Sequence, residues 1–138
     1  MAISPLNHVR AQDSLDEELD LARQLNATSH WRSGRSILEQ IEPELARASA
    51  SQRDRYDLIL AHNLALGGAP AAGLELIEQI LARRLEPTLN MHALWLAANL
   101  ATAERSYARA FSYIKTGMEM LARVDDPAAR AGLLGMAG

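Results

Sequence analysis

The chain of 138 residues contains no cysteine. Disulfide bonds and zinc sites built from thiolates are therefore excluded, although the absence of cysteine does not decide the cellular compartment of a helical protein. Aromatic residues make up only 4% of the chain, so the core has to be built mainly from leucine, isoleucine and alanine. That composition suits stacked helices and is poor for a β-sheet.

Lysine is almost absent as well: Lys115 is the one lysine among 14 basic residues, and the net charge is −3. The arginines are scattered along the sequence and form no basic stripe. Proteins that bind nucleic acid need such a stripe to neutralise phosphates. We therefore expect no nucleic-acid partner.

Long apolar runs are the third thing the sequence lacks. No stretch approaches the roughly 18 apolar residues of a membrane span, and residues 1–13 have no apolar segment of the kind found in signal peptides. We expect no membrane insertion and a cytoplasmic location, with the periplasm open if an upstream signal has been removed.

Signatures of catalysis are missing too. The histidines are His8, His30, His62 and His92, and no two of them have the spacing of zinc ligands on a helix. No glycine-rich phosphate loop follows a strand, and no serine lies in a nucleophile elbow. We therefore predict a protein that is not an enzyme and that holds no cofactor or metal.

What the sequence does contain is a pattern that recurs about every 37 to 39 residues. In each copy an apolar helix carries a small residue, and a second small residue opens a partner helix twelve positions later. The pairs are Ala22 and Gly34, Ala61 and Gly73, and Ala98 and Ala110. Small residues at helix crossings let two backbones come close. The pattern predicts three helical hairpins.

The segments around these residues also align. The predicted turns are Ser29-His30-Trp31, Gly68-Ala69-Pro70 and Arg105-Ser106-Tyr107. After each turn, apolar or small residues follow the opening residue at i+4 and i+7, which buries one face of a helix. The sequence therefore predicts an all-α protein.

The aligned hairpins resemble the tetratricopeptide (TPR) family, whose unit is a helix pair with the pattern W-x2-L-G-x2-Y, then A-x3-F, then P. The resemblance covers residues 14–138 and departs from the family in three respects. The period exceeds 34 residues, the first-helix Trp is absent, and Gly117 replaces a large residue. The resemblance implies a TPR-like α-solenoid of three helical hairpins plus an incomplete fourth, about seven helices in all. Other two-helix repeats are the nearest alternatives.

Local signals set the expected boundaries. Residues 1–13 are expected to form a flexible arm, and Ser14-Leu15-Asp16-Glu17 predicts the start of the first helix through a capping box. Pro43 is expected to kink or end the second helix, and Ser51-Gln52-Arg53-Asp54 to start the third. Residues 14–138 then form one repeat domain.

The C-terminal segment Pro127 to Gly138 is predicted to be the first helix of the fourth hairpin, without its partner helix. A lone amphipathic helix of this length is marginal in water, so we expect an N-terminal fragment of a larger protein. A natural short protein with an amphipathic cap is the alternative. We expect a homodimer that buries Leu133, Leu134 and Met136 against a second chain.

The resemblance also implies a binding groove, because the first helices of TPR hairpins line a concave face that holds a peptide. Trp95 is either a hot spot of this groove or a core residue, whereas Trp31 at a turn is expected in the core. The matching groove positions are Arg23, Asn26, Arg55, Leu58, His62, His92, Trp95, Asn99 and Thr102.

Two functions are consistent with these features. The first is a non-catalytic protein–protein interaction module that binds a protein or peptide partner of unknown identity, or that associates with itself. The alternative is a sensory or dimerisation input domain of a bacterial signalling protein, such as a diguanylate cyclase or a transcriptional regulator. The alternative rests on family analogy alone.

Overall fold

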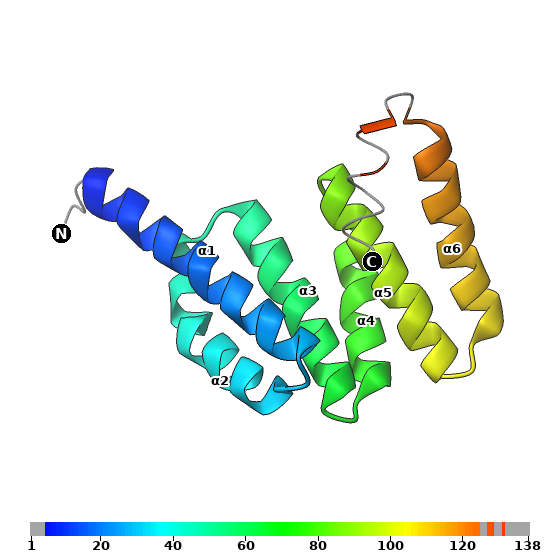
Figure 1. The fold of residues 1–138 in the computed structure, drawn as a ribbon, viewed down its shortest axis with the longest axis horizontal. Coiled ribbons are helices and arrows are strands. Elements are labelled where there is room, and N and C mark those ends of the chain that lie inside the picture. The colour runs from blue at the N-terminus through cyan, green and yellow to red at the C-terminus, as the bar shows by residue number, and fades with distance from the viewer. Residues whose placement is uncertain (1–4, 125–126, 129–130, 132–138) are drawn as a thin grey trace.

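The structure is a computed structural model that describes residues 5–124, 127–128 and 131, with side chains from residue 14 onward. The described part is all-helical, which confirms the predicted all-α class (Figure 1). Its elements are α1 (Pro5–Ala27), α2 (Trp31–Ile41), the 3₁₀ helix η1 (Glu42–Arg47), α3 (Ala50–Leu66), α4 (Pro70–Leu81), α5 (Pro87–Ala103) and α6 (Tyr107–Ala122).

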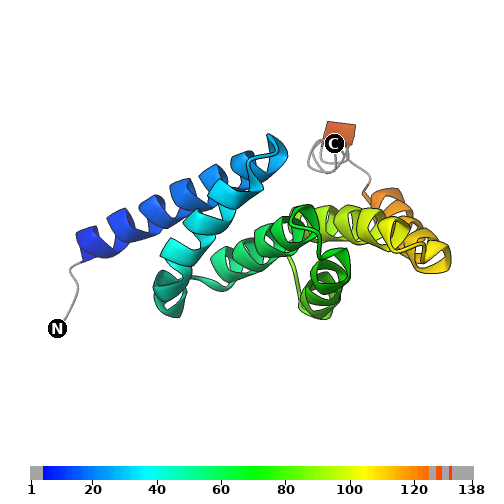
Figure 2. The same cartoon turned by 90° about the horizontal axis from the view of Figure 1, so that it is seen from below.

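The helices pack in sequential pairs, α1 with α2, α3 with α4 and α5 with α6. Figures 1 and 2 show the pair α1 and α2 at one end of the long axis and the pair α5 and α6 at the other. Contacts of α3 with α1 and α2, and of α5 with α3 and α4, join neighbouring pairs. The predicted hairpins are therefore present, each in contact with the next.

The three hairpin turns share one backbone geometry. Ser29, Gly68 and Arg105 occupy the same position in each turn and have φ angles of 66°, 96° and 59°. In each turn the next residue donates its N–H to the carbonyl five residues earlier, at 2.8–2.9 Å. This left-handed residue with its hydrogen bond is the Schellman ending of a helix. The aligned turns of the sequence are thus equivalent in three dimensions.

Small residues do lie at the helix crossings. A Cβ atom added to Gly73 would lie 2.5 Å from the carbonyl oxygen of Ala61, and one added to Gly34 would lie 3.4 Å from that of Ala22. Ala110, which opens α6, is buried, with 5% of its surface exposed. The spacing of twelve residues therefore marks positions where a small residue of the second helix is buried, and at Gly34 and Gly73 this residue lies close to the backbone of the first helix.

The connection between the first two hairpins matches the sequence in one respect and corrects it in another. As predicted, α2 ends just before Pro43, and η1 follows. The cap of α3, however, is Ser49 rather than Ser51. The Ser49 hydroxyl accepts the N–H of Gln52 at 3.1 Å, and the Gln52 side chain accepts the N–H of Ser49 at 3.0 Å. The prediction of Ser51 as the start of α3 was wrong.

The first helix also begins elsewhere than expected. It starts at Pro5, so residues 5–13 extend α1 and Ser14 lies inside it. The Ser14 hydroxyl donates to the Glu18 carboxylate at 3.4 Å instead of capping a helix end. Proline is favoured in the first turn, where its missing N–H has no partner to lose. The predicted helix at Pro127 to Gly138 falls largely outside the described residues.

Two large apolar clusters account for most of the buried residues in the described part of the molecule. The first cluster joins α1, α2 and α3 through Leu15, Leu19, Leu38 and Ile41 among others. The second joins α3, α4, α5 and α6 around residues such as Ile77. The buried residues are mainly aliphatic, in keeping with the small aromatic content.

None of the described helices is both long enough and apolar enough to cross a membrane.

Candidate functional site

The predicted groove residues lie on α1, α3 and α5, but they do not all face solvent. Seven of the nine are exposed or partly exposed, and we take five of them as one candidate surface: Arg23, Arg55, His62, His92 and Asn99. We call these five residues the first-helix face. The side chain of Arg23 is 50% exposed and that of Arg55 is 35% exposed. The groove prediction is wrong at two other positions, Asn26 and Leu58, which are buried.

Asn26 and Leu58 were predicted to line the groove, and the structure contradicts both. Asn26 is 3% exposed: its amide group donates to the carbonyl of Ile59 at 3.1 Å, and its carbonyl oxygen accepts from Asn63 at 2.9 Å. Leu58 is 2% exposed and belongs to the second apolar cluster. Both side chains fill space between helices, so neither can contact a ligand.

Thr102, another predicted groove residue, is exposed at the end of α5. Its hydroxyl donates to the carbonyl of Ala98 in the preceding turn of α5, at 2.8 Å. Threonine often makes this bond within helices. The hydroxyl proton of Thr102 is therefore used inside its own helix, although the residue is exposed like Asn99.

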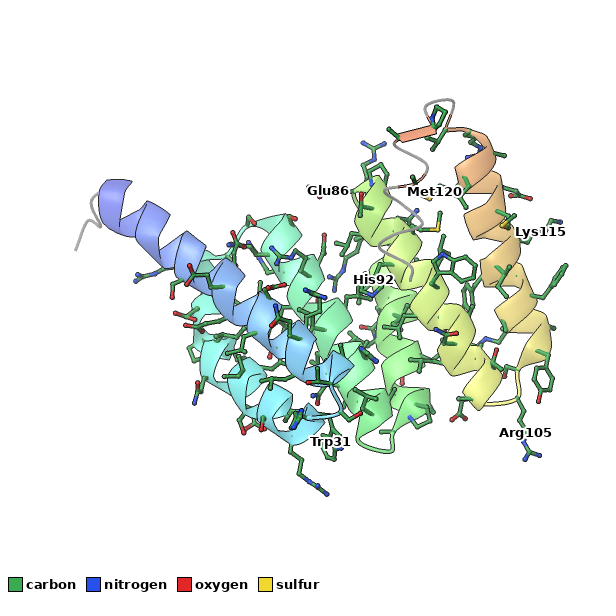
Figure 3. The ribbon with its side chains drawn as sticks, viewed as in Figure 1. Trp31, Glu86, His92, Arg105, Lys115 and Met120 are labelled. Carbon is green, nitrogen blue, oxygen red and sulfur yellow. The ribbon has the colours of Figure 1, made fainter. Side chains whose placement is uncertain are left out.

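Side chains from three successive hairpins meet at the histidines. Burial lowers the pKa of His62. Burial also lowers the pKa of His92, and the positive charges of His62 and Arg23 lower that pKa further. The charges that act on His92 thus come from α1 and α3, the first helices of the two preceding hairpins. Figure 3 shows His92 on the side of α5 that faces α1 and α3.

The arginines of this face already have carboxylate partners. Arg23 pairs with Asp20 at 2.7 Å within α1, and Arg55 of α3 pairs with Asp16 of α1 at 3.0 Å. The hydrogen bond from Arg23 lowers the pKa of Asp20, and the charges of Arg23 and Arg55 add to this effect. Because each cation is matched by an anion, the face has little net charge at neutral pH.

Trp95 lies mainly against its own hairpin. It is partly buried and packs on the small cluster of Met91 and Leu121, which joins α5 to α6. Its indole nitrogen is buried and has no hydrogen-bond acceptor among the described residues. This packing favours a core position for Trp95 over a hot spot of the groove. The unpaired indole N–H is the one feature that would suit a contact with a ligand.

Trp31 is partly buried at the first turn. A Cβ atom at Gly67, which ends α3, would lie 3.1 Å from the Trp31 ring, and the Arg32 guanidinium lies 4.9 Å from the ring centroid. The expectation of core packing holds in part, since the ring covers the end of the neighbouring hairpin.

The sequence analysis missed a buried polar junction around Asn63, whose side chain is fully buried. Its amide group donates to the carbonyl of Trp31 at 2.7 Å and to Asn26, and its carbonyl oxygen accepts from Arg35. The equivalent residue 37 positions later is Leu100, which lies against Gly73 as Asn63 lies against Gly34. The polar Asn63 at the position aligned with the apolar Leu100 was therefore the signal in the sequence that could have revealed the junction.

A second missed feature is a row of exposed apolar side chains on α6. Tyr107, Phe111, Ile114 and Met118 are 64%, 68%, 38% and 56% exposed. We call these four residues the α6 stripe. Leu133, Leu134 and Met136, which were predicted to mediate self-association, lie outside the described residues.

The described residues contain no group of three or more histidine, aspartate or glutamate side chains placed to hold a metal ion.

No protein-family model, curated protein or solved structure matches the chain.

Proposed function

We propose that this protein is a non-catalytic protein–protein interaction module of the TPR-like kind, which holds an extended peptide segment of a partner on its first-helix face. Three hairpins with one turn geometry and the same small residues at their crossings support the TPR-like part of the proposal. Repeats of this type use successive helices to build one extended surface.

The observation that carries the proposal is the convergence of Arg23, His62 and His92. Each comes from the first helix of a different hairpin, and the charges of Arg23 and His62 both lower the pKa of His92. A surface made by one hairpin would be too short for an extended chain. A face to which three hairpins contribute offers contacts over several residues of a peptide.

The chemistry of this face favours an uncharged, extended peptide. A neutral imidazole carries one donor and one acceptor, and the exposed amide of Asn99 offers both as well. Peptide backbone has the same need for alternating donors and acceptors. The arginines are already paired with Asp16 and Asp20, so strong attraction of polyanions is not expected.

The test is a selection of random twelve-residue displayed peptides on the whole chain, followed by affinity measurement with fluorescently labelled peptides. In the face variant, Arg23→Ala and Asn99→Ala are combined, because both side chains are exposed and their loss should leave the fold intact. We expect at least a tenfold loss of affinity, about 1.4 kcal/mol, which is typical of residues that matter in an interface.

The matched control combines Glu75→Ala and Gln79→Ala, two exposed residues of α4, which is a second helix. This control should bind the selected peptides like the wild type, and circular dichroism should give both variants the wild-type melting curve. Peptides that bind the face variant and the wild type equally, or a selection without specific binders, would refute the proposal.

A further inference from the structure

The α6 stripe is an apolar surface that the described part of the molecule leaves open. Its four residues are spaced by four, three and four positions, so they lie on one side of α6. Figure 3 shows Lys115 on the outer side of the same helix and Met120 on the side toward α5. Two large aromatic rings, each about two-thirds exposed, make this an unusual amount of apolar surface for one helix.

The equivalent surface of the preceding hairpin is covered. The common turn geometry aligns Tyr107, Phe111, Ile114 and Met118 with Pro70, Leu74, Ile77 and Leu81 of α4. Leu74 is 3% exposed and Ile77 is fully buried, and Leu81 packs against the same cluster, to which α5 contributes. The α6 stripe therefore corresponds to the surface through which α4 packs against the next hairpin. No helix among the described residues packs on it.

We infer that the α6 stripe binds the α6 stripe of a second copy of this chain, in an antiparallel pair about a two-fold axis. The spacing of the stripe is the same in both directions. An antiparallel copy can therefore set Tyr107 opposite Met118 of the second copy, and Phe111 opposite its Ile114. Aromatic rings pack well against methionine and aliphatic side chains. A two-fold pair also closes, so it does not grow into a polymer.

The charged groups near the stripe allow this register. Arg109 is held by Glu78 of α4 in its own copy. Lys115 comes opposite Ala110 of the second copy, and Glu119 comes opposite Ser106, next to Arg105. No two like charges are set directly against each other. The stripe supplies four side chains from each copy, fewer than the roughly 20–30 residues a side of a standard interface, so we expect the dimer to dissociate in the micromolar range or above.

This inference concerns a different surface from the first-helix face, and it stands or falls independently of peptide binding. A pair of copies would also suit the alternative of a dimerising input domain.

Sedimentation equilibrium of the whole chain tests the association. We expect the wild type to change from monomer to dimer between about 1 µM and 1 mM, and Phe111→Glu to remain monomeric over the same range. The matched control is Leu21→Glu, which places the same charge at an apolar residue of α1 that is 44% exposed. This control should dimerise like the wild type, and all three proteins should keep the same circular dichroism spectrum.

Disulfide cross-linking tests the register, because the chain has no cysteine of its own. Ile114→Cys lies near the proposed axis and should cross-link to itself. Tyr107→Cys should not, because an antiparallel pair separates its two copies by about 16 Å along the helices, too far for a disulfide. A mixture of the Tyr107→Cys and Met118→Cys variants should form a cross-link, because the proposed register sets these two positions opposite each other.

A monomeric wild type at about 1 mM, a dimer unaffected by Phe111→Glu, or self-cross-linking of Tyr107→Cys would each overturn the inference.

Discussion

At the scale of single residues, the contrast between two helical glycines is informative. Gly73 and Gly117 are both buried inside helices of the same structural role, α4 and α6. A Cβ atom at Gly73 would lie 2.5 Å from the carbonyl oxygen of Ala61, which is backbone and cannot move alone. At Gly117 the nearest atom is the Met91 sulfur at 3.5 Å, an ordinary contact distance. The two sites therefore differ in space and not in conformation.

We predict opposite effects for alanine at the two sites. Gly73→Ala forces the helices of the second hairpin apart and should lower the free energy of unfolding by about 1–3 kcal/mol. Gly117→Ala meets no obstacle and improves helix propensity, so it should raise that free energy by up to about 1 kcal/mol. Urea denaturation of both variants measures the difference. Equal effects of the two substitutions would show that close approach at Gly73 is not what fixes the crossing.

The two half-buried histidines predict how stability depends on pH. Burial lowers the pKa of both His62 and His92 from the ordinary value of 6.5, and the nearby Arg23 lowers that of His92 further. The unfolded chain therefore takes up protons at these residues before the folded protein does. Stability should be constant above about pH 6.5 and should fall as the pH drops below that value.

Thermal melts between pH 8 and pH 5 should show the melting temperature falling as the pH drops, and His92→Gln should make this fall smaller. The matched control is His30→Gln, the same substitution at an exposed histidine, against which the effect of His92→Gln is compared. This window lies above the ordinary pKa of 3.8 for Asp20, and Arg23 lowers that pKa further, so the pair of Asp20 and Arg23 contributes little to it. A wild-type melting temperature that stays constant down to pH 5 would contradict the prediction.

At the scale of helices and turns, the sequence predicts positions better than it predicts boundaries. The small residues of each hairpin and the three turns could be found from spacing, because helix crossings and helix ends need particular side chains or lengths. Only one of the three left-handed turn residues, Gly68, is a glycine. The conformations of Ser29 and Arg105 follow from alignment with that turn and not from their own preferences.

The helix caps show why boundaries fail. Ser49 and Ser51 are both suitable cap residues, and the choice is made by Gln52, whose side chain reaches back to the N–H of Ser49. Glutamine three positions after serine satisfies two helix-end donors at once. The Ser14 signal has a similar form but lies within α1, where the helix continues on both sides. A local pattern of this kind is therefore not sufficient to place a cap.

The candidate site shows the same limit. Arg23 and Asn99 could be placed on an exposed face from their distance to Ala22 and Ala98, since one position along a helix turns the side chain by a fixed angle. The burial of Asn26 could not be found in this way. It depends on Asn63, a residue 37 positions away that takes Asn26 as a hydrogen-bond partner. Polar residues buried by such distant pairing look like surface residues in the sequence.

At the scale of the whole molecule, the two apolar clusters meet at α3. The second hairpin and the third share one apolar cluster, which extends through α3, α4, α5 and α6. The first hairpin also shares apolar contacts with α3, but its junction includes the polar groups of Asn26, Asn63 and Arg35. Chains of repeats gain stability from contacts between neighbours. The first hairpin is therefore expected to open before the other two.

Native-state hydrogen exchange tests this order. Backbone amides of α1 and α2 should exchange through an opening of lower free energy than those of α4 and α5, in one cooperative unit. Asn63→Leu, which copies the aligned Leu100, should lower the opening free energy of the first hairpin by about 1–3 kcal/mol. The substitution leaves the carbonyl of Trp31 and the side chain of Asn26 buried without their partner.

The control for this experiment is Asn99→Leu, the same chemical change at an exposed position of α5. It breaks no bond between hairpins, so it should leave the exchange of α1 and α2 unchanged. If Asn63→Leu instead lowered protection in α1 and α5 by equal amounts, all three hairpins would open together. In that case the polar junction would not divide the molecule, and its hydrogen bonds would stabilise one undivided cooperative fold.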